Sequence, residues 1–209
     1  NSVRLILGDN QMIPLTSKHE VAILNTKGIL HSEGLRTLNY TYVKRDSLEN
    51  VSEYHTLIVP KGERQKVIFS DSSWVVLNAQ STMKYPVVFR GKERKVYVEG
   101  EAYFEVTRDE KYPFVVSVKN FDVRVLGTSF NVMTYRGRTI TTLVEGKVCL
   151  TYKDESVLMV PDRQAEVIAE TGKILMREVD ARNFTLWKDG VFYFENAALE
   201  TIAERLSQW

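Results

Sequence analysis

One stretch of eleven residues, 96–106, constrains the fold of the chain more than any other. Its apolar or small residues fall on alternate positions, and glutamates and tyrosines occupy the positions between them. A period of two is typical of a strand with one buried face, because successive side chains point to opposite faces of a sheet. Gly100 and Ala102 are small members of the apolar face, so we expect a bulky side chain or another backbone to pack closely there. Two more alternating runs follow at 114–118 and 121–125, and together the three predict the middle of an antiparallel sheet.

Hairpin patterns recur along the chain. Residues 3–15, 67–77 and 148–160 each contain two apolar runs around a polar turn, and residues 165–179 repeat the pattern around Thr171-Gly172. Gly, Asp and Asn tolerate the positive φ that such turns require. About a dozen strands and no helix before residue 196 predict a mainly β fold, an antiparallel sheet domain of repeated hairpins. The repetition is too weak to predict a solenoid. The other strands are expected at 21–25, 28–30, 38–43, 54–59, 139–145 and 147–152, with a surface loop at 44–53.

The last residues change character. Asp189-Gly190 leads into a dense aromatic strand at 191–194, and Asn196 is a candidate N-cap for an amphipathic helix at 197–208. A strand followed by such a helix is half of a βαβ unit. We therefore expect an all-β domain over residues 1–181 and the first strand and helix of a small, incomplete α+β domain over residues 182–209.

Composition and charge exclude several classes of protein. The apolar fraction of 44% and the charged fraction of 26% are ordinary for a globular chain. The chain has 28 Lys and Arg residues against 27 Asp and Glu residues, so its net charge is too small to favour the binding of nucleic acid. No run of eighteen apolar residues could span a membrane. The one basic cluster is interpreted as a solvated turn and consists of Arg90, Lys92, Arg94 and Lys95.

Candidate chemistry is sparse, and we expect no catalysis, metal or cofactor. The histidines His19, His31 and His55 lack the spacing of metal ligands and are expected at the surface or in loops. Cys149 is the single cysteine, so an internal disulfide is excluded. It has no local base to activate it and is interpreted as a half-buried structural thiol. The acids Glu99, Glu101 and Glu105 share one strand face, and a glycosidase-like pair is geometrically conceivable. An alternating charged face is more typical of the wet side of a sheet, which is the interpretation we prefer.

Several motifs, in order along the chain, resemble the FecR family. They are Asn78-Ala79, Gly-Glu-Ala-Tyr-Phe-Glu-Val at 100–106, Pro113-Phe114, Val-Leu-Gly-Thr-Ser-Phe-Asn-Val at 125–132, Thr-Leu-Val-Glu-Gly at 142–146, and Trp187 with Gly190. Two turns depart from the family pattern, because Ser72 and Asp162 stand where the family usually has glycine. A residue other than glycine at positive φ costs about 1 kcal/mol, which leaves the type of these turns open.

The resemblance implies a function. Members are single-pass inner-membrane regulators, and this chain would be the periplasmic part, lacking the membrane helix and the cytoplasmic segment that binds a sigma factor. The partner would be the signalling domain of an outer-membrane TonB-dependent transducer. The candidate contact surface is the aromatic strand and the helix face, made of Val191, Phe192, Tyr193, Phe194, Leu199, Ile202 and Leu206. The same residues could instead be the interior of the small C-terminal domain.

A second hypothesis stays open from the residues alone. Twenty-two aromatic residues would also suit a carbohydrate-binding or adhesive β module of the cell envelope, since sugar faces stack on Tyr and Trp rings. A row of exposed rings would favour that module, and burial of the rings would count against it.

Overall fold

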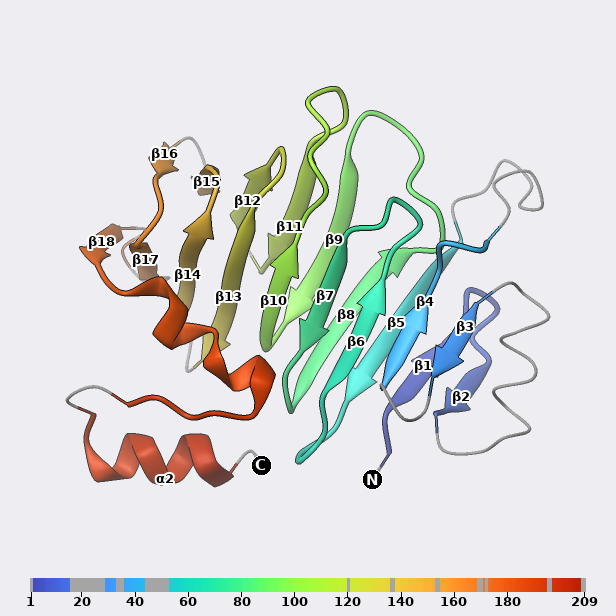
Figure 1. Ribbon diagram of the computed structural model, residues 1–209, viewed down its shortest axis with the longest axis horizontal. Coiled ribbons are helices and arrows are strands. Elements are labelled where there is room, and N and C mark those ends of the chain that lie inside the picture. Colours follow the sequence, from blue (N-terminus) through green and yellow to red (C-terminus); the bar gives the residue numbers. More distant parts are fainter. Residues whose placement is uncertain are drawn as a thin grey trace.

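The computed structural model describes residues 2–15, 29–32, 36–43, 53–119, 121–135, 138–152, 155–168, 171, 173–194 and 197–207. Within them the chain forms two nine-stranded sheets, two short 3₁₀ helices and one α-helix (Figure 1). Sheet A has the order β16 (Glu155–Met159), β15 (Val148–Tyr152), β12 (Phe121–Val125), β11 (Phe114–Val118), β9 (Arg94–Glu99), β8 (Ser81–Pro86), β5 (Tyr54–Val59), β1 (Arg4–Ile6) and β2 (Met12–Pro14). Sheet B has the order β18 (Ile174–Glu178), β17 (Arg163–Ile168), β14 (Arg138–Glu145), β13 (Ser129–Tyr135), β10 (Glu101–Glu105), β7 (Trp74–Leu77), β6 (Gln65–Ile68), β4 (Thr37–Asn39) and β3 (Leu30–Ser32). The prediction of a mainly β fold is confirmed.

The chain passes repeatedly between the two sheets as it advances from one end of the molecule to the other (Figure 1). Most neighbouring strands are antiparallel, but β9 pairs with β11 and β4 pairs with β6 in parallel. Each parallel pair is separated along the chain by one strand of the other sheet, β10 or β5, after which the chain returns in its original direction. The sheets are therefore mixed rather than wholly antiparallel.

The hydrophobic core lies between the sheets. Val96 and Val98 of β9 and Ala102 of β10 are buried, as the alternating pattern predicts, although the two strands belong to different sheets. The ring of Phe104 in sheet B lies 5.9 Å from the ring of Phe114 in sheet A. Buried side chains of both sheets form one cluster, and each large apolar side chain that is buried in this way stabilises the fold by about 1.5–3 kcal/mol.

Gly100 is the point at which the chain crosses from sheet A to sheet B. Its φ is +101°, and a Cβ at this position would lie 2.4 Å from the Oγ atom and 2.7 Å from the Cα atom of Ser81. The Gly100 N–H donates to Thr134 Oγ1 at 2.6 Å, and the Glu101 N–H donates to Ser81 Oγ at 2.9 Å. The predicted close approach at Gly100 is thus confirmed, and the approaching residue is Ser81, through both its side chain and its backbone.

The predicted hairpins form. The antiparallel pairs are β1 with β2, β6 with β7, β11 with β12, β15 with β16, and β17 with β18. Ser72 and Asp162 keep positive φ angles of 69° and 60°, so these turns retain the left-handed conformation without glycine. Gly146, with a φ of +92°, joins β14 to β15 across the two sheets. The strand predicted at 21–25, most of the loop predicted at 44–53, His19 and the side chain of His31 lie outside the described residues.

His55 contradicts the prediction that the histidines lie at the surface or in loops. It belongs to β5 and is only 1% exposed, because it occupies the inward phase of that strand two residues before Leu57. Its Nδ1 atom lies 2.9 Å from the hydroxyl of Tyr40, which in turn lies 2.8 Å from the hydroxyl of Tyr85. Its Nε2 atom lies 3.1 Å from Glu53 Oε1. Hydrogen bonds on both ring nitrogens make burial of this polar side chain tolerable.

The buried tyrosines predict a loss of stability at alkaline pH. Burial raises the pKa of Tyr40, assisted by the nearby Tyr85, and burial likewise raises the pKa of Tyr85. A folded-state pKa above the unfolded value stabilises the fold below pH about 10, and this contribution is lost as the pH rises towards the folded pKa. We expect Tyr85→Phe to reduce the slope of the unfolding free energy against pH by up to about 1.4 kcal/mol per pH unit between pH about 10 and 12. Urea titrations at a series of pH values measure the free energy of unfolding, and the control is Tyr97→Phe at an exposed tyrosine. An unchanged slope in Tyr85→Phe would contradict the prediction.

Candidate partner-binding site

Two 3₁₀ helices, η2 (Ala181–Phe184) and η3 (Leu186–Asp189), follow the last strand. The Asp180 side chain accepts a hydrogen bond from the Arg182 N–H and caps η2. Gly190, with a φ of +85°, ends η3, and its N–H donates to the carbonyl of Trp187. The prediction of no helix before residue 196 is therefore wrong in this short region. Four residues are too few for a helical period to show in the sequence.

The predicted strand at 191–194 is also wrong. These residues are extended but have no strand beside them in the described part of the chain, and the Val191 N–H donates to the Leu186 carbonyl at 3.2 Å instead. Aromatic composition favours strands, but a strand forms only where a neighbour pairs with it. The rings of Phe192 and Phe194 stack with their centroids 6.4 Å apart, as residues two apart in an extended chain can.

The aromatic residues of this segment gather around one shallow hollow. Val191 and Phe192 are 51% and 37% exposed, whereas Tyr193 and Phe194 are half-buried. The hollow is lined by these four residues together with Asn183, Phe184 and Trp187. Four of the seven predicted contact residues therefore form a single surface, which we call the aromatic segment.

The predicted helix is confirmed as α2 (Leu199–Ser207), while its candidate cap Asn196 lies outside the described residues. Leu199 is 83% exposed and Leu206 45% exposed, and Ile202 is half-buried. Figure 1 shows α2 outside the outline of both sheets, and its three apolar residues do not line the hollow of the aromatic segment. No helix in the described part of the chain combines the length and the apolar character needed to cross a bilayer.

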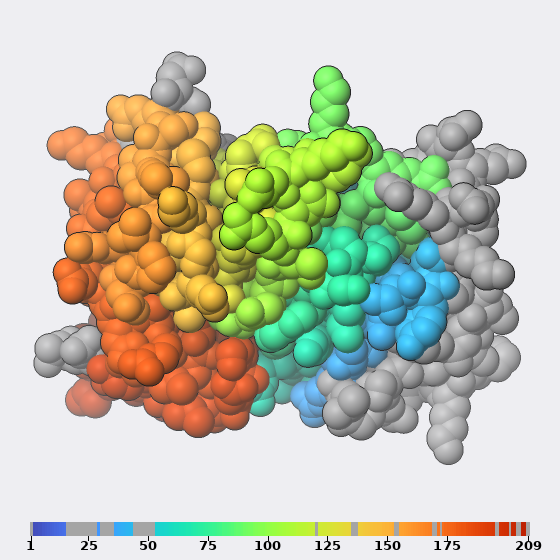
Figure 2. All heavy atoms as spheres, turned by 45° about the horizontal axis from the view of Figure 1, so that its top comes forward, coloured from blue at the N-terminus to red at the C-terminus, as the bar shows by residue number. Residues whose placement is uncertain are grey.

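The outer face of sheet B differs from the solvated face predicted for its glutamates. Glu101 is only 8% exposed, and its carboxylate accepts hydrogen bonds from Asn78 Nδ2 at 2.7 Å and from Asn131 Nδ2 at 3.0 Å. The indole N–H of Trp187 donates to Asn131 Oδ1 at 3.1 Å. Glu101 is buried because η3 covers this face. Figure 2 shows the red C-terminal residues flush against the orange and green parts of the molecular surface.

The other two glutamates do not form a catalytic pair with Glu101. Glu99 is exposed, and Glu105 accepts hydrogen bonds from the Tyr103 hydroxyl and from Ser129 Oγ, both at 2.8 Å. Burial and the bond to Glu105 raise the pKa of Tyr103, which keeps its proton at neutral pH. The described residues contain no group of three His, Cys, Asp or Glu side chains that could hold a metal ion, and Cys149 is half-buried.

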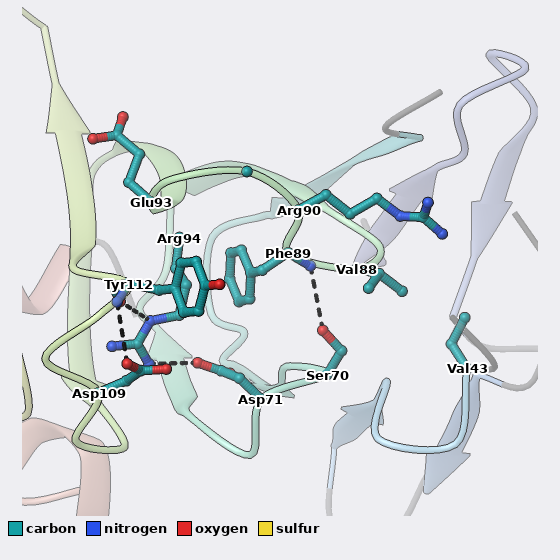
Figure 3. Close-up of a pocket in the computed structure, with 11 residues that line it drawn as sticks. Val43, Ser70, Asp71, Val88, Phe89, Arg90, Glu93, Arg94, Asp109 and Tyr112 are labelled. Carbon is teal, nitrogen blue, oxygen red and sulfur yellow. Dashed lines mark hydrogen bonds and ion pairs between the residues drawn. The ribbon is translucent and has the colours of Figure 1, made fainter. Parts of the chain in front are cut away.

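A separate cleft of about 420 Å³ lies beside Arg94 (Figure 3). Arg94 and Tyr112 form one side of it and Val43 the opposite side, with Asp71 and Phe89 between them. Arg94 is 3% exposed, so the interpretation of its basic cluster as a solvated turn is wrong for this residue. Its Nη1 atom donates to Asp71 Oδ2 at 2.7 Å, and its Nε donates to the Tyr112 carbonyl at 2.8 Å. Charges of both signs line the cleft, and the ion pair between Arg94 and Asp71 ties the start of β9 to the turn between β6 and β7.

Comparisons with known proteins bear on this arrangement. The family model described as FecR protein matches residues 55–149, from β5 into β15. Two crystal structures of a putative anti-sigma factor from Parabacteroides distasonis ATCC 8503 are similar to the chain. One is 35% identical with a TM-score of 0.69, and the similarity covers 73% of each chain. The other is 34% identical with a TM-score of 0.69 and a coverage of 74% of each chain. No curated protein matches.

Proposed function

The chain belongs to the FecR family of anti-sigma factor regulators, and from this premise we propose that it is the periplasmic part of a single-pass inner-membrane regulator. In this proposal it receives its signal by contact with the signalling domain of an outer-membrane TonB-dependent transducer. A cytoplasmic segment outside this sequence passes the signal to the sigma factor. The family is typically non-enzymatic, so the work of this chain is recognition.

The observation that supports the proposal most is the exposure of the apolar side of α2. A helix of nine residues is marginal in water by itself and normally gains its stability by burying an apolar stripe. Here Leu199 and Leu206 of that stripe are 83% and 45% exposed. A partner that buries both would supply the missing stabilisation.

The chemistry of the surface indicates how such a partner binds. The leucines suit a helix-in-groove contact, and the extended aromatic segment offers rings together with backbone groups for an added strand. Both modes call for a folded protein domain with an apolar groove or an open sheet edge. The signalling domain of a transducer is the partner that membership of the family favours.

Calorimetric titration of the chain with the signalling domain of the transducer encoded beside it tests this proposal. We expect saturable binding by the native chain and at least tenfold weaker binding by the double variant Leu199→Glu, Leu206→Glu, because an apolar contact is replaced by charge. Glutamate is a good helix former, so α2 should persist, and circular dichroism checks this. Leu158→Glu on β16 is the matched control, since Leu158 is 60% exposed on another element. Absence of heat from the folded native chain would refute the proposal.

In a competing arrangement, Leu199 and Leu206 belong to the interior of a small α+β domain. We propose that residues 182–209 are the first part of that domain. In a chain extended beyond Trp209 the two leucines would then be inaccessible. Their substitution would unfold that domain instead of weakening binding alone. The same titration with the extended chain, accompanied by thermal unfolding, separates the two arrangements.

No observation favours the carbohydrate-binding alternative. The most exposed tyrosines, Tyr42, Tyr97 and Tyr112, lie on separate segments of the chain. Trp187 is buried, and Trp74 is half-buried with Lys66 Nζ 4.1 Å above its ring. No single strand or segment among the described residues therefore carries these three exposed tyrosine rings.

A further inference from the structure

Residues 181–190, which we call the clasp, are fixed to the outer face of sheet B by polar contacts. At the centre of the clasp, Trp187 is 5% exposed and its Nε1 atom donates to Asn131 Oδ1. Asn131 donates in turn to Glu101 Oε1, which connects the clasp to the middle of the sheet. These bonds join residues 56 and 30 positions apart in the sequence.

Two more contacts hold the ends of the clasp. Arg64, in the loop between β5 and β6, donates through Nη1 to the carbonyls of Trp187 at 2.6 Å and Lys188 at 3.1 Å. These carbonyls lie at the C-terminal end of η3, where a cation is favourable. At the other end, Ala181 is fully buried and its N–H donates to Asp162 Oδ1 at 3.2 Å.

The composition of this contact makes the clasp separable from the sandwich. Of its ten residues only Ala181, Thr185 and Trp187 are buried. Trp187 bonds Asn131, which in turn bonds Glu101, and both of these side chains are polar, so water can satisfy them when the clasp lifts. The hydrophobic core lies on the opposite side of sheet B and would remain closed. Segments with few buried apolar contacts open locally at a lower free energy than the whole domain.

The clasp also shapes the proposed docking surface. Phe184 and Trp187 line the same hollow as Val191, Phe192 and Phe194, so the aromatic segment lies against the clasp. We propose that residues 181–190 are a detachable clasp, that Trp187 fastens it, and that only the fastened form presents the aromatic segment to the partner. The statement about the partner rests on the function proposed above. A partner with higher affinity for the fastened form necessarily shifts the clasp towards that form.

Hydrogen exchange of the unbound chain tests the clasp by itself. The reporters are the hydrogen-bonded amides of Thr185, Lys188 and Gly190. In the native chain they should exchange by local opening, faster than the amides of β10 and β13. Trp187→Phe keeps a ring but removes the N–H donor, and should speed their exchange roughly tenfold while the strand amides stay unchanged. Arg64→Met should speed the same amides by removing a different contact. Trp74→Phe, the same substitution on a half-buried residue of sheet B, is the matched control and should leave them unchanged.

Exchange of clasp and strand amides at one common rate in every variant would overturn the clasp, because it would then open only when the sandwich unfolds. Titration with the signalling domain tests the coupling separately. Saturation should slow exchange of the three reporters in the native chain, because a partner that binds only the fastened form suppresses opening. Trp187→Phe should weaken binding by less than its tenfold effect on exchange, because affinity falls only as the fastened fraction falls. Saturable binding that leaves exchange of the three reporters unchanged would overturn the coupling while leaving the transducer contact intact. No binding by the native chain, with local exchange as expected, would refute the transducer contact and the coupling but retain the clasp.

Discussion

Replacing Gly100 by alanine is expected to destabilise the β-sandwich by roughly 3–5 kcal/mol. One part of this cost, about 1–2 kcal/mol, comes from holding an alanine at a φ of +101°. The larger part comes from the new Cβ, which would lie 2.7 Å from the Cα atom of Ser81. Backbone cannot rotate away as a flexible side chain can, so β8 and β10 must separate and lose packing between them. Urea unfolding followed by circular dichroism measures the difference.

Gly91 offers a matched control. Its φ is +102°, almost the same as that of Gly100, but a Cβ built there would meet nothing within 4 Å. Gly91→Ala should therefore cost only the conformational part, about 1–2 kcal/mol. The difference between the two variants isolates the close approach to Ser81. Equal costs would show that the crossing between the sheets does not depend on this contact.

The alternating pattern around Gly100 predicts much of the fold but not the crossing itself. The phase of residues 96–106 correctly identifies Val96, Val98 and Phe104 as core. A period of two reports which side of the chain is buried, and the inner sides of both sheets face the same core. The pattern therefore continues unbroken when the chain leaves sheet A at Glu99 and enters sheet B at Glu101. Within residues 96–106, only Gly100 marks the point where the chain crosses from sheet A to sheet B.

Two buried polar residues could have been found from the phase of their strands. Arg94 precedes Val96 and Val98 by the same step of two, and His55 stands in the same relation to Leu57. Both side chains point inward, as their phase requires. The interpretation of both as surface residues gave more weight to polar character than to position. A polar residue in the inward phase instead predicts a buried hydrogen-bonded group.

The burial of Glu101 and the path of the aromatic segment could not be predicted in this way. Glu101 lies in the outward phase of β10 and is covered by η3, whose Trp187 follows Asn131 by 56 positions. No local pattern reports a contact over that distance. The same limit explains the incorrect strand at 191–194, since composition indicates a preference for strand but cannot supply the neighbour. The burial of Glu101 and the path of residues 191–194 both depend on contacts between distant parts of the chain, and only the structure shows such contacts.

Replacing Arg94 by methionine is expected to cost about 3 kcal/mol, because it removes one partner of a largely buried ion pair. Arg94 Nη1 bonds Asp71 Oδ2 at 2.7 Å and the Thr107 carbonyl at 2.9 Å, and Nε bonds the Tyr112 carbonyl at 2.8 Å. The guanidinium thus joins the turn of the β6–β7 hairpin to the loop between β10 and β11. Methionine fills much of the volume above the Phe114 ring but donates no hydrogen bond, so the Thr107 and Tyr112 carbonyls lose the bonds from Arg94, and Asp71 loses its cation while keeping the Ser73 hydroxyl. The Asp71 side chain is 20% exposed, so water relieves part of the loss and the low end of the usual range applies.

Arg108→Met is the matched control for this variant. The Arg108 side chain is 77% exposed and its partner Glu110 is 68% exposed, so the loss should stay within about 0.5 kcal/mol. A double-mutant cycle of Arg94→Met with Asp71→Ala should show a coupling free energy above about 1 kcal/mol, since each substitution leaves the other group without its partner. Urea unfolding of the four chains gives the cycle. If Arg94→Met costs no more than Arg108→Met, the guanidinium does not hold the hairpin turn against the loop, and that end of the sandwich depends on its apolar core alone.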